Sequence, residues 1–267
     1  MLAIFLTVFI DLLGFGILIP VFPLLISPGS PFRVTPEGWS FTQGLIMLGW
    51  LQAIFPFCIF IAAPILGQLS DRHGRKPVLA FSIFGTALGY ALFAIGISTA
   101  NIPLLFAARA LDGITGGNLA VAQAAIGDVS THENRAKNFG MLGAAFGLGF
   151  IIGPYLGGRL SSPDTSFYGL FHTPSWFGAT TPFWFATILA LANCASILTM
   201  FPETLKEKFH GGRIKISRAV SNVVGGFKSD RLRVVLMAGF LFSAGFTFFT
   251  TFFGVYLRNN FNFSSAK

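Results

Sequence analysis

Long apolar stretches separated by short polar segments make up most of the chain. A helix needs about 20 apolar residues to cross the core of a bilayer. Seven stretches are long enough, at residues 2–26, 44–67, 77–98, 102–127, 138–158, 181–202 and 234–257. Glycine and proline occur inside several of them, and membrane helices tolerate both residues. The pattern therefore predicts an all-α polytopic membrane protein.

The composition agrees with a membrane location. Of the 267 residues, 53% are hydrophobic and only 10% are charged, whereas soluble domains carry about 25% charged residues. The two cysteines, Cys58 and Cys194, lie inside apolar stretches and predict neither a disulfide nor a metal site. The first stretch is too long for a signal peptide and has no basic segment before it. No pattern of residues predicts a metal, a cofactor, a nucleotide site or hydrolytic chemistry, so we expect no enzyme.

The net charge of +8 comes from basic residues in the segments between apolar stretches, which argues against a nucleic-acid partner. Thirteen of the 18 Lys and Arg residues fall in segments 68–76, 128–137 and 203–233, and four fall on the opposite side. Short cytoplasmic loops carry an excess of Lys and Arg. We therefore expect these three segments, and the N-terminus, to be cytoplasmic in a multi-pass cell-membrane protein.

The third basic segment is the longest and divides the chain. It predicts a six-helix domain over 1–202, a linker over 203–233, and the first helix of an incomplete C-terminal domain over 234–267. Within the linker, apolar and basic residues interleave. Two alternatives fit this pattern, a helix lying on the anionic inner leaflet or a disordered basic linker. The interleaved residues are Arg213, Ile214, Lys215, Ile216, Arg218, Ala219, Val220, Val223, Phe227 and Lys228.

The six stretches before the linker divide into two sets of three. Residues 63–67 (APILG) in the second stretch and 153–157 (GPYLG) in the fifth share the pattern small-Pro-x-x-Gly at corresponding places. Repeats of three helices in inverted topology are typical of transporters. We therefore predict a 3+3 inverted repeat within the first 202 residues.

Asp11 lies near the middle of the first apolar stretch. An ionised Asp at that depth costs about 2.5–3.5 kcal/mol, so it faces a polar cavity or partner, or holds a proton. One interpretation is a site for a proton or for a cationic substrate. The alternative is a structural hydrogen bond to a neighbouring helix.

Arg109 and Asp112 lie three residues apart in the fourth stretch, so they can share one face of a helix. Either they form a self-neutralising ion pair, or Arg109 keeps a nearby carboxylate ionised until a conformational change separates them. Three polar residues inside apolar stretches are candidates to line a central cavity or to bond between helices, namely Gln52, Asn118 and Gln123.

Three motifs together resemble the major facilitator superfamily. Segment 67–77 reads GQLSDRHGRKP and matches the signature G-x-L-S-D-x-x-G-R-K of that superfamily at Gly67, Asp71, Arg72, Gly74, Arg75 and Lys76. Arg109 followed by Gly113 resembles its R-x-x-x-G element. Segment 149–158 reads GFIIGPYLGG and matches the antiporter motif at Gly149, Gly153, Pro154, Gly157 and Gly158. The first and sixth stretches are similar to those of tetracycline/proton antiporters, the sixth through Pro182, Phe183, Trp184, Asn193, Pro202 and Glu203.

This resemblance implies proton-coupled efflux of a small amphiphilic, drug-like or tetracycline-like molecule by alternating access. It implies a coupling role for Arg109, a latch between two halves in segment 67–77, and a kinked fifth helix typical of exporters. A topogenic turn and close helix packing would also account for the last two elements. The partners are then the small-molecule substrate, protons and the lipid bilayer, for a monomeric protein. Uptake of a nutrient or metabolite, and a non-transporting receptor or remnant, are the alternatives.

The superfamily has two six-helix halves with the substrate between them. The chain stops at Lys267, shortly after the seventh apolar stretch. We therefore expect a fragment of a protein with about twelve spans. The fragment would lack one wall of the cavity, so we do not expect it to transport alone.

Overall fold

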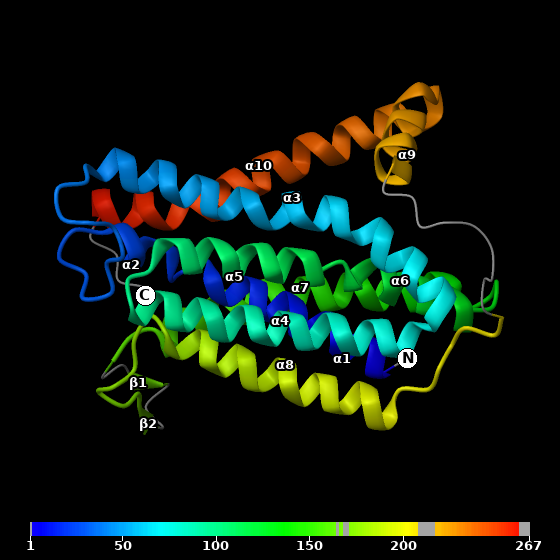
Figure 1. The fold of residues 1–267 in the computed structure, drawn as a ribbon, viewed down its shortest axis with the longest axis horizontal. Helices are drawn as coiled ribbons and strands as arrows, with labels where there is room; N and C mark the ends of the chain where they lie inside the picture. The colour runs from blue at the N-terminus through cyan, green and yellow to red at the C-terminus, as the bar shows by residue number, and fades with distance from the viewer. Residues whose placement is uncertain (1, 164–165, 168–170, 208–216, 262–267) are drawn as a thin grey trace.

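A computed structural model describes residues 2–163, 166–167, 171–207 and 217–261 of the chain. Long helices run side by side and form an elongated bundle (Figure 1). The helices are α1 (Leu2–Leu18), α2 (Phe22–Ile26), α3 (Phe41–His73), α4 (Arg75–Ser98), α5 (Ile102–Thr115), α6 (Asn118–Val129), α7 (Arg135–Leu160), α8 (Thr181–Met200), α9 (Ser217–Lys228) and α10 (Asp230–Phe261). Two short antiparallel strands, β1 (Ser166–Phe167) and β2 (Phe171–His172), pair at one end of the bundle.

The predicted all-α membrane fold is confirmed. Among the described residues, six helical segments are long and apolar enough to cross a membrane. Each overlaps one of the predicted spans, and they are Ile4–Ile26, Phe41–His73, Arg75–Ser98, Arg135–Leu160, Thr181–Met200 and Leu232–Leu257. The first combines α1 and α2, which are separated by a turn next to Pro20 and Pro23.

The predicted span over 102–127 is not one continuous helix. It consists of α5 and α6, which are separated by Gly116 and Gly117 and follow one another along the bundle (Figure 1). Glycine is a poor helix former, and here it is also sterically required. A Cβ atom on Gly117 would lie 2.8 Å from the Cα atom of Ala63 in α3. The break therefore lies at one of the points where this span packs closely on α3.

The predicted loop over 68–76 is almost entirely helical. α3 has 33 residues and ends at His73, and α4 begins at Arg75. A helix of that length is about 50 Å long, so it extends beyond a hydrocarbon core of about 30 Å. The polar residues of the segment therefore lie on helical ends that project from the membrane. Gly74 joins the two helices with a φ angle of 107°, which favours glycine.

The packing of the helices follows the predicted repeat. α1 packs on α7, and α3 packs on α5. The first span thus contacts the fifth, and the fourth span contacts the second. Each contact joins the first helix of one triplet to the second helix of the other. The small residue before the proline of the repeated motif makes a close backbone contact with the partner span in both triplets. A Cβ atom on Gly153 would lie 2.8 Å from the Cα atom of Gly16, while Ala63 is the residue that restricts Gly117. Exchanging the two triplets therefore preserves both contacts.

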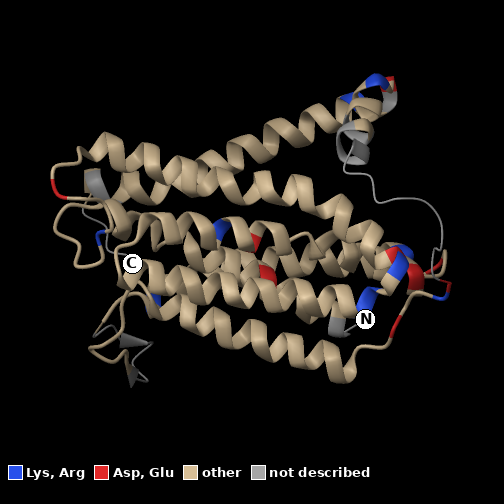
Figure 2. Ribbon diagram, in the orientation of Figure 1, with Lys and Arg blue, Asp and Glu red and all other residues tan. Residues whose placement is uncertain are grey.

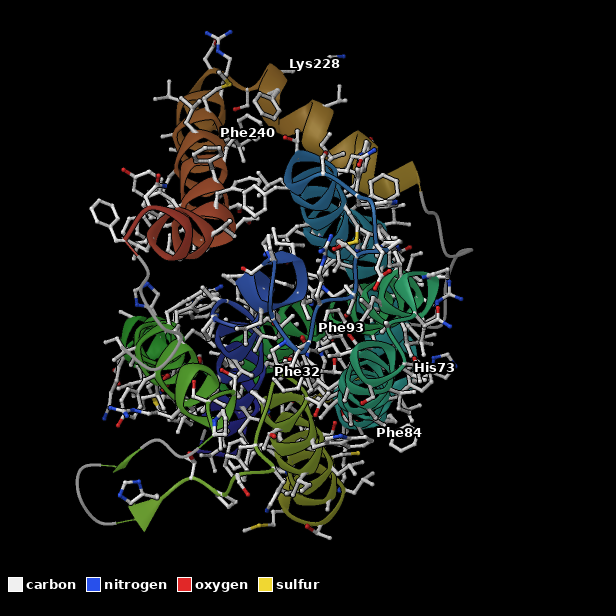
Figure 3. The ribbon with its side chains drawn as sticks, turned by 90° about the vertical axis from the view of Figure 1, so that its left-hand side faces the viewer. Phe32, His73, Phe84, Phe93, Lys228 and Phe240 are labelled. Carbon is white, nitrogen blue, oxygen red and sulfur yellow. The ribbon has the colours of Figure 1, made fainter. Side chains whose placement is uncertain are left out.

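α9 and α10 lie at the side of the bundle, next to α3 and away from α8 (Figures 1 and 3). α10 carries many exposed apolar side chains, Phe240 and Phe242 among them. Its second half approaches α2 and α3, and Thr251 and Val255 are buried there. α9 shows that part of the basic linker is helical, while residues 208–216 lie outside the described part of the chain.

We expect Gly153→Ala to lower the free energy of unfolding by about 1–3 kcal/mol, because a buried methyl group would push two backbones apart. The added Cβ atom would also lie 2.8 Å from the carbonyl oxygen of Leu13. Gly143→Ala is the matched control on the same helix, because a Cβ atom there meets nothing within 4 Å. Thermal unfolding in detergent micelles measures both changes. Equal stability of the two variants would contradict this packing.

Candidate functional site

Charged residues gather at the two ends of the bundle, and few lie between them (Figure 2). The residues in the middle are Asp11 of α1 and the pair Arg109 and Asp112 of α5. Arg109 and Asp112 are only 2% and 4% exposed, and Asp11 is partly buried. Charges at this depth need partners, so their contacts determine what the site can do.

The guanidinium group of Arg109 has partners on two helices. Its Nη1 atom lies 3.1 Å from Oδ2 of Asp112, and its Nη2 atom donates to Oε1 of Gln52 at 3.3 Å. The guanidinium carbon lies 4.2 Å from the centre of the Phe55 ring, an arrangement that attracts a cation to the negative face of the ring. The contacts with Gln52 and Phe55 hold α3 and α5 together around a nearly neutral charge pair.

Asp11 faces Asn118 at the start of α6, whose side-chain amide donates to a carboxylate oxygen of Asp11. Both residues line a cavity of about 150 Å³ next to the ion pair. Apolar residues form most of its wall, and its polar and aromatic lining residues are Asp11, Asp112, Asn118, Thr86, Tyr90, Phe15, Phe55 and Phe146. The cavity therefore has carboxyl groups from two helices within an apolar surround.

The three candidate polar residues differ in position. Asn118 lines the cavity and bonds to Asp11. Gln52 is buried beside the cavity, where its Nε2 atom donates to the hydroxyl of Thr251 in α10 at 3.4 Å. Gln52 thus links α10 to Arg109. Gln123 lies exposed on α6 and is not among the residues that line the cavity.

A second charged cluster lies where α3 meets α4. The buried side chain of Arg75 contacts Asp71 at 2.6 Å and Asp128 at 3.0 Å, and its Nη1 atom donates to the hydroxyl of Ser70 at 2.6 Å. Gly74 and Arg75 are buried, Arg72 and Lys76 are half-buried, and Gly67 lies within α3 next to open space. The signature segment therefore ties the ends of α3, α4 and α6 together.

Glu203 completes this cluster, although the sequence analysis assigned it no role there. Its carboxylate accepts hydrogen bonds from the backbone N–H groups of Arg75 (2.8 Å), Lys76 (3.2 Å) and Leu205 (3.0 Å). Partial burial by itself raises the pKa of Glu203, but these bonds outweigh it and lower the pKa below its ordinary value. Glu203 thus caps the first turn of α4, where a negative charge is stabilising. The sequence feature that could have indicated this role is the position of Glu203, an acidic residue directly after an apolar span.

The fold and these two clusters define a class of protein, a polytopic α-helical membrane protein with buried charges around an internal cavity. Residues 4–267 match the model of the Major Facilitator Superfamily, so the chain belongs to that family of transporters. The resemblance noted in the sequence motifs is thereby confirmed.

The chain is similar to several tetracycline resistance proteins. It is 35% identical to the class H protein of Pasteurella multocida over 233 residues, 87% of this chain and 52% of that protein. It is 41% identical to the class E protein of Escherichia coli over 152 residues, 57% of this chain and 34% of that protein. The chain therefore spans about half, or less, of the length of these relatives.

A crystal structure of the human organic anion transporter MFSD10 (TETRAN) has the same fold. It superposes with a TM-score of 0.69 at 24% identity, over 99% of this chain and 66% of that one. A D-xylose-proton symporter superposes with a TM-score of 0.55 at 19% identity, over 76% of this chain and 48% of that one. At these identities the likeness concerns the arrangement of helices.

We expect Gln52→Leu to lower the free energy of unfolding by about 1–3 kcal/mol, because it removes a partner from a buried guanidinium group. Thr251→Val removes the hydrogen bond from Gln52 and the bond of the Thr251 hydroxyl to the carbonyl of Thr247. It leaves the bond between Arg109 and Gln52 in place, so we expect a smaller loss of about 0.5–1.5 kcal/mol. The double variant should show coupling, since Gln52 links both sites. Thermal unfolding in micelles of all three variants measures this. Thr250→Val is the control, because its hydroxyl, like that of Thr251, bonds to a carbonyl of α10, and within the described part of the chain it has no bond to Gln52.

We expect Glu203→Gln to destabilise the fold by about 1 kcal/mol at neutral pH through loss of a charged helix cap. Because the pKa of Glu203 is lowered in the folded state, the stability that Glu203 contributes depends on pH. It is present above the ordinary glutamate pKa of about 4.3 and is lost as the pH falls through the lower folded-state value. The variant should therefore lose less stability on acidification than the unmodified chain. Glu207→Gln, at an exposed position, is the control, and identical acid unfolding of both variants would refute the cap.

Proposed function

We propose that this chain is the N-terminal part of a proton-coupled transporter that exports a small amphiphilic, drug-like or tetracycline-like molecule by alternating access. One observation carries the proposal. Asp11 lines a cavity inside the membrane bundle, within reach of Asn118 and next to the buried pair of Arg109 and Asp112. Ionisable residues at this depth mark proton and substrate pathways in membrane proteins.

Asp11 is the proposed site for a proton or for a cationic group of the substrate. In the outward-open state the cavity admits a proton, and in the inward-open state Asp11 releases it and accepts the substrate. Each charge that crosses the membrane field contributes about 2.3 kcal/mol per 100 mV. The aromatic rings of Phe15, Phe55 and Phe146 provide an apolar surface suited to an amphiphilic molecule.

Arg109 and Asp112 are the proposed coupling pair. Their direct contact neutralises both charges while the bundle has the present packing. A movement of α3 that withdraws Gln52 and Phe55 would remove two partners of the Arg109 guanidinium. Arg109 could then shift relative to Asp112, which would change the tendency of Asp112 to take up a proton. The pair thereby links proton occupancy to the position of a helix.

Export is the proposed direction because the relatives with up to 41% identity are tetracycline resistance proteins. The glycine and proline motif of α7 supports it through the resemblance to antiporters. The transporting form is proposed to have a second helical half that begins with residues 234–267, joined to domain 1–202 by linker 203–233, and to work as a monomer. The charged cluster of Arg75 and Glu203 is then a latch between the halves.

The end of the bundle that carries this latch is the proposed cytoplasmic end, in a cell membrane. The described parts of the segments with most of the Lys and Arg residues lie there, and the positive-inside rule assigns such segments to the cytoplasm. The N-terminus lies at the same end (Figure 1).

We expect Asp11→Asn to reduce proton-driven tetracycline transport by about tenfold or more, because the amide cannot exchange a proton at this site. The measurement is uptake of labelled tetracycline into everted membrane vesicles that contain the transporting form with both helical halves, with and without an imposed pH gradient. Substrate exchange without a gradient should persist if Asp11 carries only the proton, and should also fail if it binds a cationic group.

Glu37→Gln is the control, because Glu37 is exposed in the connection before α3. Unchanged pH-driven transport by the Asp11→Asn variant would refute the role of Asp11. Substrate movement in the opposite direction, coupled to inward proton flow in intact cells, would replace export with uptake.

A further inference from the structure

α9 is a helix that the proposed transport mechanism does not use. It joins α10 through the single residue Ser229. The backbone N–H of Ser229 donates to the carbonyl of Gly226 at 3.2 Å, and that of Arg233 donates to the carbonyl of Ser229 at 2.8 Å. Gly226 also approaches Leu236 of α10 so closely that a Cβ atom would lie 2.8 Å from its side chain. This turn fixes the direction of α9 relative to α10.

The direction of α9 differs from that of the membrane helices. In Figure 1 the long helices run along the bundle, whereas α9 crosses its end. Figure 3 looks along the bundle, and there α9 extends across the view while the other helices are seen closer to end-on. Because the long helices cross the membrane, a helix at a steep angle to them lies along the membrane surface.

The depth of α9 follows from its connection. The apolar span of α10 begins at Leu232, four residues after Lys228. Four residues of helix rise by about 6 Å. α9 therefore lies at the level of the lipid headgroups, next to the end of the hydrocarbon core.

The chemistry of α9 suits this level. Val224 and Phe227 are 45% and 36% exposed, and Lys228 is exposed beside them. The charged residues of α9 are Arg218 and Lys228, and both are basic. A helix that combines exposed apolar residues with unopposed positive charge is typical of helices that bind anionic lipid surfaces.

We propose that α9 binds anionic phospholipid headgroups at the membrane surface, with Val224 and Phe227 toward the acyl chains and Lys228 against the lipid phosphates. The occupant of this surface is the bilayer itself, because the orientation, the depth and the charge of α9 all match it. The bound helix anchors the connection between α8 and α10 to the membrane. This anchor is independent of the transport direction and of the substrate.

Hydrogen exchange of the purified chain in lipid nanodiscs tests the proposal. Amides of residues 217–228 should exchange more slowly in nanodiscs of phosphatidylcholine with phosphatidylglycerol than in phosphatidylcholine alone. The double variant Arg218→Gln and Lys228→Gln should lose most of this difference, with about a fivefold change expected for each charge. Phe227→Ser should speed exchange in both lipid compositions, because it removes the apolar contact.

Lys137→Gln is the matched control, since Lys137 is an exposed cation of α7 outside α9. It should leave the lipid dependence of residues 217–228 unchanged. Two outcomes would overturn the proposal. One is equal exchange of α9 in neutral and anionic nanodiscs. The other is a loss of lipid dependence in the Lys137→Gln variant as large as in the double variant, which would mean that net charge alone is responsible.

Discussion

Burying the guanidinium group of Arg109 inside an apolar bundle is the constraint on which the rest of the site depends. A buried charge without a partner costs several kcal/mol, so its neighbours are determined by its needs. Asp112 supplies the opposite charge from the same helix, and α3 supplies both Gln52 and the face of Phe55. α3 must therefore pack closely on α5, and the close approach at Gly117 is part of that packing.

The same packing produces the cavity. The helix break at Gly116 and Gly117 starts a new helix at Asn118, and this start brings the Asn118 amide to Asp11 of α1. If α5 and α6 were one continuous helix, the direction of the Asn118 side chain would be fixed by the helical repeat of α5. The glycines therefore contribute twice, by allowing close contact with α3 and by freeing the orientation of the residue that bonds to Asp11.

Local features of the site could be predicted from the sequence, and long-range ones could not. The three-residue spacing of Arg109 and Asp112 predicted that both lie on one face of a helix. The length of the apolar stretches predicted most of the membrane spans. The bond of Asp11 to Asn118 joins residues 107 apart, and that of Gln52 to Thr251 joins residues 199 apart. Both depend on tertiary packing that no local pattern encodes. Residues 68–76 were predicted as a loop because they are polar. A helix end that projects from the membrane into water is polar as well, so polarity alone does not distinguish the two.

α3 connects the two charged clusters as one body. It carries Gln52 and Phe55 at the buried ion pair and Ser70 and Asp71 at Arg75. The centres of these two sets lie about 26 Å apart at the rise of an α-helix. A helix that is continuous over this length cannot tilt without disturbing both sets, although Pro56 and Pro64 lie between them and lower its stiffness. We therefore expect a change in the charge state around Arg109 to alter the contacts of Arg75 through the position of α3.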